Sequence, residues 1–419
     1  MSVEELHARI AAIDNEIDSQ KKLLAKLEND KSSIQRQLNA VLDPMARLPL
    51  EISSEIFLQS IAWPQHAPTS LLQICNAWAD IALATPALWT TVHIHFPCSD
   101  HFAKVLPIWF ERARSRPLSI SMSLSGLASN WNHRVSDVVW SHGGHLKHLE
   151  ILDSDDPTDD GFAFDDESQK MDLFGNATSV SLPLLQTLTI RCQHRREFRA
   201  SQICQLLCAA PNVVEFISDK VWTGNDPAPE NLVVPTLRRV IFGETSSDDE
   251  IFAYLTLPAL EALSLPMRYI SGSELLACVE RSAAPLQDLA LGWKFGMIES
   301  VQLHSCLRLI PTLTRFKIWR PSVQVVTELF VALVDSPSLL PNLRDLTIHL
   351  YHADRDPPNL SESSWRTLIR ALSTRRVERL YIVPILVSPP MDVLASLRDL
   401  VANGAEMHIG TEELNFVVI

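Results

Sequence analysis

The sequence is poor in the features that mark fibrous, disulfide-stapled and membrane-spanning proteins. Glycine accounts for 12 of 419 residues, while apolar residues make up 46%, which excludes a collagen-like or wholly disordered chain. No apolar run reaches the roughly 18 residues of a membrane helix. The seven cysteines contain no C-x-x-C pair, so we expect small buried side chains in a reducing compartment. The first residues do not resemble a signal peptide, and we therefore expect a cytoplasmic and/or nuclear protein.

The chain also lacks the short motifs of common enzyme families. It contains no G-x-S-x-G, P-loop, H-E-x-x-H or dinucleotide fingerprint, so we expect neither an enzyme nor a bound cofactor or metal. Two weak metal-site alternatives exist, and ordinary packing is the simpler interpretation of both. The first set lacks a fourth ligand at zinc-site spacing, and the three histidines of the second are not expected to converge on one point. Their members are His194, Cys204 and Cys208 in the first, and His142, His145 and His148 in the second.

Charge is unevenly distributed. The formal net charge is −14, and most of it lies in two short segments, 153–172 and 244–250. We expect loops there, either solvated or used to dock a basic partner, with 153–172 inserted in the first of a series of repeats. A chain that is nearly neutral elsewhere does not suit nucleic acid. One small basic cluster does not change this expectation; it consists of Arg191, Arg195, Arg196 and Arg199.

The first 43 residues predict a long helix. Residues 4–42 contain no Gly or Pro and are rich in good helix formers. Residues 6–41 keep an unbroken spacing of three and four, which is typical of a coiled coil that pairs with another helix or a second copy. Packing against the chain's own body is the alternative. The seam comprises Leu6, Ile10, Ile13, Ile17, Gln20, Leu24, Leu27, Lys31, Ile34, Leu38 and Val41. Asp43-Pro44 should end the helix.

A set of short helices follows the long one. Leu48-Pro49 is a helix start, because proline fits the first turn. A second helix is expected from about residue 69, and Thr85-Pro86 begins a short third element. About 45 residues of short helices hold little core on their own. The apolar surface of this segment must therefore be completed by a partner or by the rest of the chain.

These residues resemble a known family. The patterns LP-x-EI-xx-EIF, L-xx-IC-xx-W-xx-IA and TP-x-LW over 44–92 look like the F-box of fungal F-box proteins. The resemblance implies a small all-α domain that binds a Skp-type adaptor and, through it, a cullin scaffold. The chain would then be the substrate receptor of an SCF-type ubiquitin ligase, or alternatively a scaffold protein that works outside any ligase. The implied adaptor contacts are Leu48, Pro49, Ile52, Ile56, Cys75 and Trp78. Ala79 departs from the family, which often has Arg there.

The rest of the chain repeats one short pattern. Nine segments carry apolar residues in an L-xx-L-x-L arrangement, with helix-like stretches between them. Spacings in or near 20–29 residues are typical of leucine-rich repeats. The fold class is therefore α+β overall, with a long helix, the F-box, a linking region at 93–144, and an irregular leucine-rich-repeat-like α/β solenoid at 145–419 whose curved parallel sheet has helices outside. Unrelated α/β packing is the alternative. The segments begin at residues 146, 185, 213, 237, 260, 286, 313, 343 and 377.

Alternate residues of the later repeats predict a binding surface. Strand geometry points them to the concave face, opposite the apolar core positions. This patch combines arginines and aromatics, the residue types that dominate binding hot spots, and suits an acidic or phosphorylated peptide. Its members are Arg315, Lys317, Trp319, Arg379 and Tyr381. Half-buried edge positions are the alternative for the Trp and the Tyr. The acidic segment 153–172 could compete for the patch in cis.

Overall fold

The chain forms two compact units. The computed structural model describes residues 3–61, 68–153, 170–175, 177, 179–198, 200–223, 231–243, 254–265, 272–292, 300–351 and 359–418. We call Met1–Thr91 with Pro107–Arg116 the helical unit, and Val92–Leu106 with Pro117–Ile419 the sheet unit.

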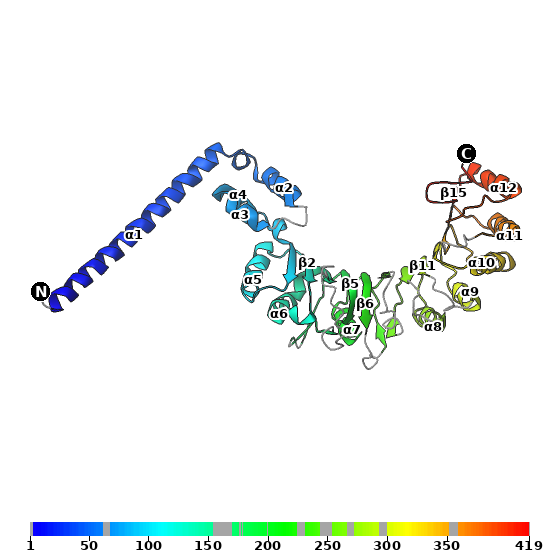
Figure 1. Ribbon diagram of the computed structural model, residues 1–419, viewed down its shortest axis with the longest axis horizontal. Helices are drawn as coiled ribbons and strands as arrows, with labels where there is room; N and C mark the ends of the chain where they lie inside the picture. Colours follow the sequence, from blue (N-terminus) through cyan, green and yellow to red (C-terminus); the bar gives the residue numbers. More distant parts are fainter. Residues whose placement is uncertain are drawn as a thin grey trace. The chain divides into compact units, whose positions relative to one another are not determined.

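The helical unit begins with α1 (Val3–Leu42), drawn as one continuous helix in Figure 1. It ends at the predicted Asp43-Pro44 step. The Asp43 carboxylate accepts hydrogen bonds from the backbone N–H of Met45 at 2.8 Å and from Nε1 of Trp78 at 2.7 Å. One acidic side chain therefore fixes the helix end against the short helices that follow. These are η1 (Met45–Arg47), α2 (Leu50–Ile61), η2 (Pro68–Ser70), α3 (Leu71–Ile74), α4 (Asn76–Ala84) and η3 (Pro86–Trp89).

Aromatic side chains form the small core of the helical unit. Phe57 of α2 is 1% exposed, and its ring centroid lies 4.9 Å from that of Trp78. Trp89 is fully buried and donates through Nε1 to the carbonyl of Ala82 at 2.9 Å. Trp109 meets the Trp89 ring edge-on at 5.2 Å, and the Arg112 guanidinium lies 4.5 Å from the Trp89 centroid. These large rings supply most of the burial that so short a segment can reach.

The sheet unit is one long sheet built in chain order. Every pairing with a described register is parallel. The strands along its path are β1 (Thr91–Phe96), β2 (Leu118–Leu124), β3 (Leu146–Asp153), β5 (Thr187–Phe198), β6 (Glu215–Thr223), β8 (Arg239–Phe242), β10 (Ala262–Leu265), β11 (Asp288–Gly292), β12 (Arg315–Trp319), β13 (Asp345–His349), β14 (Arg379–Val383) and β15 (Glu406–Ile409). β4 (Lys170–Met171) pairs with β5, while β7 (Leu232–Val233) and β9 (Leu255–Thr256) form a separate pair.

Helices return the chain between strands. Figure 1 shows those of the sheet unit along one side of a bending sheet. Parallel neighbours need such crossovers, because the chain must travel back before the next strand begins. The helices are α5 (Phe102–Ala113), of which Pro107–Ala113 belongs to the helical unit, α6 (His133–Ser141), α7 (Ala200–Ala209), α8 (Gly272–Ser282), α9 (Ser300–Arg308), α10 (Val323–Asp335), α11 (Glu362–Ser373) and α12 (Met391–Ala402).

The core of the sheet unit consists of apolar rows that run across the strands. Each residue of a row lies opposite its neighbour in the strand register, so each repeat buries its side chain against the next one. One row of side chains, each no more than 5% exposed, comprises Leu188, Phe216, Val240, Leu263, Leu289, Phe316, Leu346, Leu380 and Met407.

The predicted fold class is confirmed: a long helix is followed by a leucine-rich-repeat-like solenoid with a parallel sheet. All nine repeated segments contain strands of this sheet. The sheet is longer than the nine repeat strands predicted, since β1 and β2 precede the first repeat and β15 follows the last. Their sequences, TVHIHF, LSISMSL and EMHI, alternate without the leading L-xx-L. Residues 154–169 and 244–250, which hold most of the acidic charge, lie outside the described residues.

Candidate functional site

The five residues of the predicted patch lie on one face of the sheet. Arg315, Lys317 and Trp319 alternate along β12 with core side chains that are at most 1% exposed. Arg379 and Tyr381 alternate in the same way along β14. The strand between them, β13, aligns Asp345 with both arginines and His349 with Trp319. The geometry therefore brings the predicted residues together, away from the helix-covered core.

A row of alternating charge crosses this face at the start of the strands. Arg315 reaches the Asp288 carboxylate at 3.0 Å, Arg379 reaches Asp345 at 3.2 Å, and Arg239 reaches Glu215 at 3.3 Å. The register places these residues directly opposite one another on neighbouring strands. Exposed cross-strand pairs contribute little stability, roughly 0.2–1 kcal/mol each. The two arginines of the patch are thus already neutralised, and an acidic peptide would have to compete with Asp288 and Asp345.

A ladder of stacked rings runs beside the charged row. The Trp319 and His349 rings stack with centroids 3.9 Å apart. The His349 and Tyr381 centroids lie 5.4 Å apart, and Tyr381 stacks on His408 at 4.7 Å. We call Trp319, His349, Tyr381 and His408 the ring ladder. It spans β12 to β15 and forms a half-buried row of rings, a residue type that contributes large apolar contact area to binding.

Cationic and polar neighbours fix the ring ladder. The Lys317 ammonium lies 4.0 Å from the Trp319 ring centroid, in cation–π geometry. Burial, together with the charge of Lys317, lowers the pKa of His349 to about 4, so this ring is neutral at pH 7. His408 donates through Nε2 to the carbonyl of Thr411 at 2.6 Å. The rings of the ladder are therefore held in position before any ligand binds.

Sequence reasoning missed two parts of this site. His408 lies on β15, whose short alternating sequence was not recognised as a strand. Asp288 was not singled out, although it stands two residues after the first apolar position of its repeat, as Arg315 and Asp345 do. Aligning the repeats at that position would have revealed the alternating charge. The stacking of the rings depends on side-chain packing that no sequence pattern records.

The helical unit carries a second candidate surface. Three of the predicted contact residues are solvent-exposed apolar side chains: Leu48 at 40%, Ile52 at 50% and Ile56 at 42%. Pro49 is also exposed. Ile52 and Ile56 stand one turn apart on α2, whereas the adjacent positions Ser53 and Phe57 are buried. Leu50 and Ile74 extend the exposed apolar surface. An amphipathic helix has here buried one face and left an apolar stripe beside it in water.

The other two predicted contact residues belong to the interior of the helical unit. Trp78 and Cys75 are half-buried, and both donate to Oδ2 of Asp43, at 2.7 Å and 3.4 Å. Their polar atoms are thus used within the unit, and Trp78 also packs on Phe57. They lie in the interior beneath the exposed stripe and expose less side-chain surface to a partner than Ile52 and Ile56 do.

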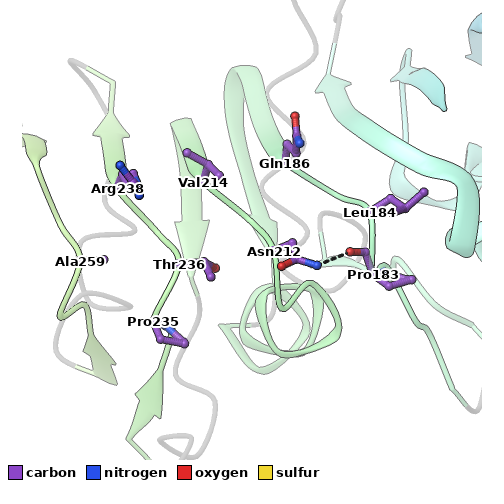
Figure 2. Close-up of a pocket in the computed structure, with 9 residues that line it drawn as sticks. All are labelled: Pro183, Leu184, Gln186, Asn212, Val214, Pro235, Thr236, Arg238 and Ala259. Atoms are coloured by element: carbon purple, nitrogen blue, oxygen red, sulfur yellow. Dashed lines mark hydrogen bonds between the residues drawn. The ribbon is translucent and has the colours of Figure 1, made fainter.

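A hollow of about 400 Å³ lies at the N-terminal ends of β5, β6, β8 and β10 (Figure 2). Its Arg238 is paired with Glu261 at 3.0 Å. Asn212 donates to the carbonyl of Pro183 at 2.7 Å, as drawn, and Thr236 bonds the carbonyl of Pro211 at 2.9 Å. The same bond recurs further along, from Asn342 to Pro311. The hollow is part of a structural ladder that links the turns of successive repeats.

The remaining sequence candidates do not form a site in the described residues. Cys204 is buried on α7 and Cys208 is exposed, while the side chain of His194 lies outside the description. His142 ends α6 and contacts the carbonyl of Val138, and His148 lies on β3. No group of three or more His, Cys, Asp or Glu side chains in the described ranges is placed to hold a metal ion. Within those ranges, no helix is both long and apolar enough to cross a bilayer.

Comparison with known proteins finds similarity to solved structures but not to curated sequences. No family model matches the chain, and no curated protein matches it. The crystal structure of a Bacteroides fragilis protein from the Northeast Structural Genomics Consortium is similar over 75% of this chain and 72% of its own, with 13% identity and a TM-score of 0.33. A TM-score this low does not define a common fold.

Proposed function

We propose that this protein is the substrate-recognition subunit of an SCF-type cullin–RING ubiquitin ligase. The exposed apolar stripe of the helical unit, with Leu48, Ile52 and Ile56 at 40–50% exposure, carries the proposal. It coincides with the residues that, by resemblance to the F-box, would contact a Skp-type adaptor. Each large apolar side chain gains about 1.5–3 kcal/mol on full burial. A stripe of this kind supports stable binding to an apolar partner surface.

The sheet unit would hold the substrate. Its concave face is built from a parallel sheet with fixed register, so a ligand bound there avoids much of the entropy cost of ordering a loop. On this face, the ring ladder and Lys317 offer aromatic and cationic groups that are not paired with a carboxylate in the described residues. We infer that the substrate presents planar or apolar side chains to the rings. The protein itself would carry out no chemistry and would act by proximity.

The adaptor half of the proposal is tested by replacing Ile56 with Asp in the full chain. Co-purification of the Skp-type adaptor and the cullin should be lost, because an unpaired carboxylate buried at an interface costs several kcal/mol. Leu309→Asp is the matched control, since Leu309 of the sheet unit is 45% exposed against 42% for Ile56. Adaptor binding by both variants would refute the proposed contact. Adaptor binding without cullin in the wild type would favour the scaffold alternative.

A further inference from the structure

The apolar seam of α1 is exposed along its whole described length. Its side chains range from 42% exposed at Leu6 to 66% at Ile34. Exposure of this regularity on one continuous helix marks a surface that is completed by another helix. The seam members with described apolar side chains are Leu6, Ile10, Ile13, Ile17, Leu24, Leu27, Ile34 and Leu38.

Charges beside the seam identify what covers it. When the seam residues are assigned to heptad positions a and d, Leu6 is a d residue and Ile10 an a residue. Arg9 and Glu16 then occupy g positions, while Asp14 and Lys21 occupy e positions. In a parallel, in-register pair each g residue faces the e residue five places later on the other helix. Arg9 meets Asp14, and Glu16 meets Lys21. Both pairs join opposite charges and form twice by symmetry, and no g–e pair joins like charges.

The antiparallel arrangement is less complementary. There, e residues face e residues and g residues face g residues, with each a layer opposite a d layer. In the register with the greatest overlap, Leu6 lies opposite Leu38. Asp14 then faces Glu28, Glu16 faces Asp30, and each Lys21 faces the other Lys21. All three contacts join like charges, whereas both charged pairs of the parallel arrangement join opposite charges.

The two polar seam residues agree with a parallel pair. Gln20 and Lys31 would each meet their own copy, and a lysine at a single a position costs stability while it fixes register and strand number. Asp30 precedes Lys31 at a g position and borders the hole into which the other Lys31 inserts. This carboxylate offsets the repulsion between the two ammonium groups.

We propose that α1 pairs with α1 of a second copy of this chain as a parallel, in-register, two-stranded coiled coil. The occupant of the seam is thus this protein itself, and the dimer joins two helical units and two sheet units. Because the two α1 helices are parallel, the short helices that follow α1 in each copy begin at the same end of the coiled coil.

The experiment measures the mass of the purified full chain by sedimentation over a range of concentrations. Wild type should be dimeric. Glu16→Lys should dissociate at least tenfold more readily, since each new lysine would face Lys21 of the other helix, twice per dimer, and Lys21→Glu should behave likewise. An equimolar mixture of the two variants should regain a dimer, because every pair between positions 16 and 21 is then opposite in charge. Glu28→Lys is the matched control, since Glu28 faces the uncharged Leu23 in the parallel pair.

Each other outcome overturns the proposal. A wild-type chain that stays monomeric at the highest concentration has no self-pairing seam. A Glu16→Lys variant that associates more tightly than the wild type indicates the antiparallel pair, in which position 16 faces Asp30. A larger oligomer contradicts the two-stranded assignment. All three substitutions lie on exposed positions of α1, so the circular dichroism melt of the sheet unit serves as a control for folding.

Discussion

The sheet unit buries its rows of apolar side chains, whereas the helical unit leaves several large apolar side chains exposed. In the sheet unit, Phe316 and Leu346 face each other across neighbouring strands, and each is 1% exposed. In the helical unit, the large apolar side chains of Ile52 and Ile56 are 50% and 42% exposed. A repeat array gives every apolar row a neighbour within the same chain. A few short helices cannot bury all of their apolar side chains against one another. The apolar surface that remains exposed is the expected binding site for another molecule.

The largest expected effect tests this contrast directly. Phe316→Ala should lower the free energy of unfolding of the sheet unit by about 3–5 kcal/mol, because it opens a cavity in a continuous row. Ile52→Ala should change stability by no more than about 0.5 kcal/mol, since its side chain is half in water. Urea titration followed by circular dichroism measures both. Comparable losses would show that the exposed stripe is needed for folding and is not kept for a partner.

A second prediction separates the two surfaces by function. The double variant Trp319→Ala/Tyr381→Ala should lose about 2 kcal/mol or more of substrate affinity, as expected for aromatic hot spots, and should keep the Skp-type adaptor. Ubiquitylated proteins that accumulate under proteasome inhibition, compared between wild type and variant by mass spectrometry, provide the readout. Arg239→Ala is the control on the same face, outside the ring ladder. If the substrate and the adaptor were lost together, misfolding would be the cause.

The smallest effect is a pH dependence located in the sheet unit. The pKa of His349 is lowered to about 4, below its ordinary value, so the unfolded chain takes up this proton first as pH falls. The stabilising effect of the neutral ring is complete above about pH 6.5 and declines as pH approaches 4, on the order of 1 kcal/mol after allowance for its half-exposure. His349→Phe keeps a ring and removes the proton. The free energy of unfolding, measured by urea titration, should differ less between pH 7 and pH 5 in the variant than in the wild type.

The part of this pH dependence that comes from His349 can be separated from the part that comes from other histidines of the same chain. His148 and His304 also have pKa values lowered by burial, so part of the acid destabilisation should persist in His349→Phe. If the substitution leaves the loss of stability between pH 7 and pH 5 unchanged, the whole effect belongs to those other histidines.

Much of the fold followed from patterns that depend on local chemistry. The three–four spacing of α1, the Asp43-Pro44 stop and the recurring L-xx-L-x-L segments each require only neighbouring residues to be read. β2 and β15 were missed, because a short alternating strand resembles many loop sequences until its neighbours are known. The face of the candidate site was also predictable, since alternation along β12 and β14 dictates it.

The sequence by itself determined the long helix, the order of the elements, and which side chains of each repeat point to the core. Only the tertiary structure decided how those side chains combine. Strand register paired Arg315 with Asp288 and stacked Trp319 on His349, and packing of α2 chose which face of that helix stayed in water. Periodicity is a property of one segment, whereas register and burial depend on residues far apart in the chain. For that reason the stacking of the ring ladder could not be predicted, whereas aligning the repeats would have shown the alternating charge.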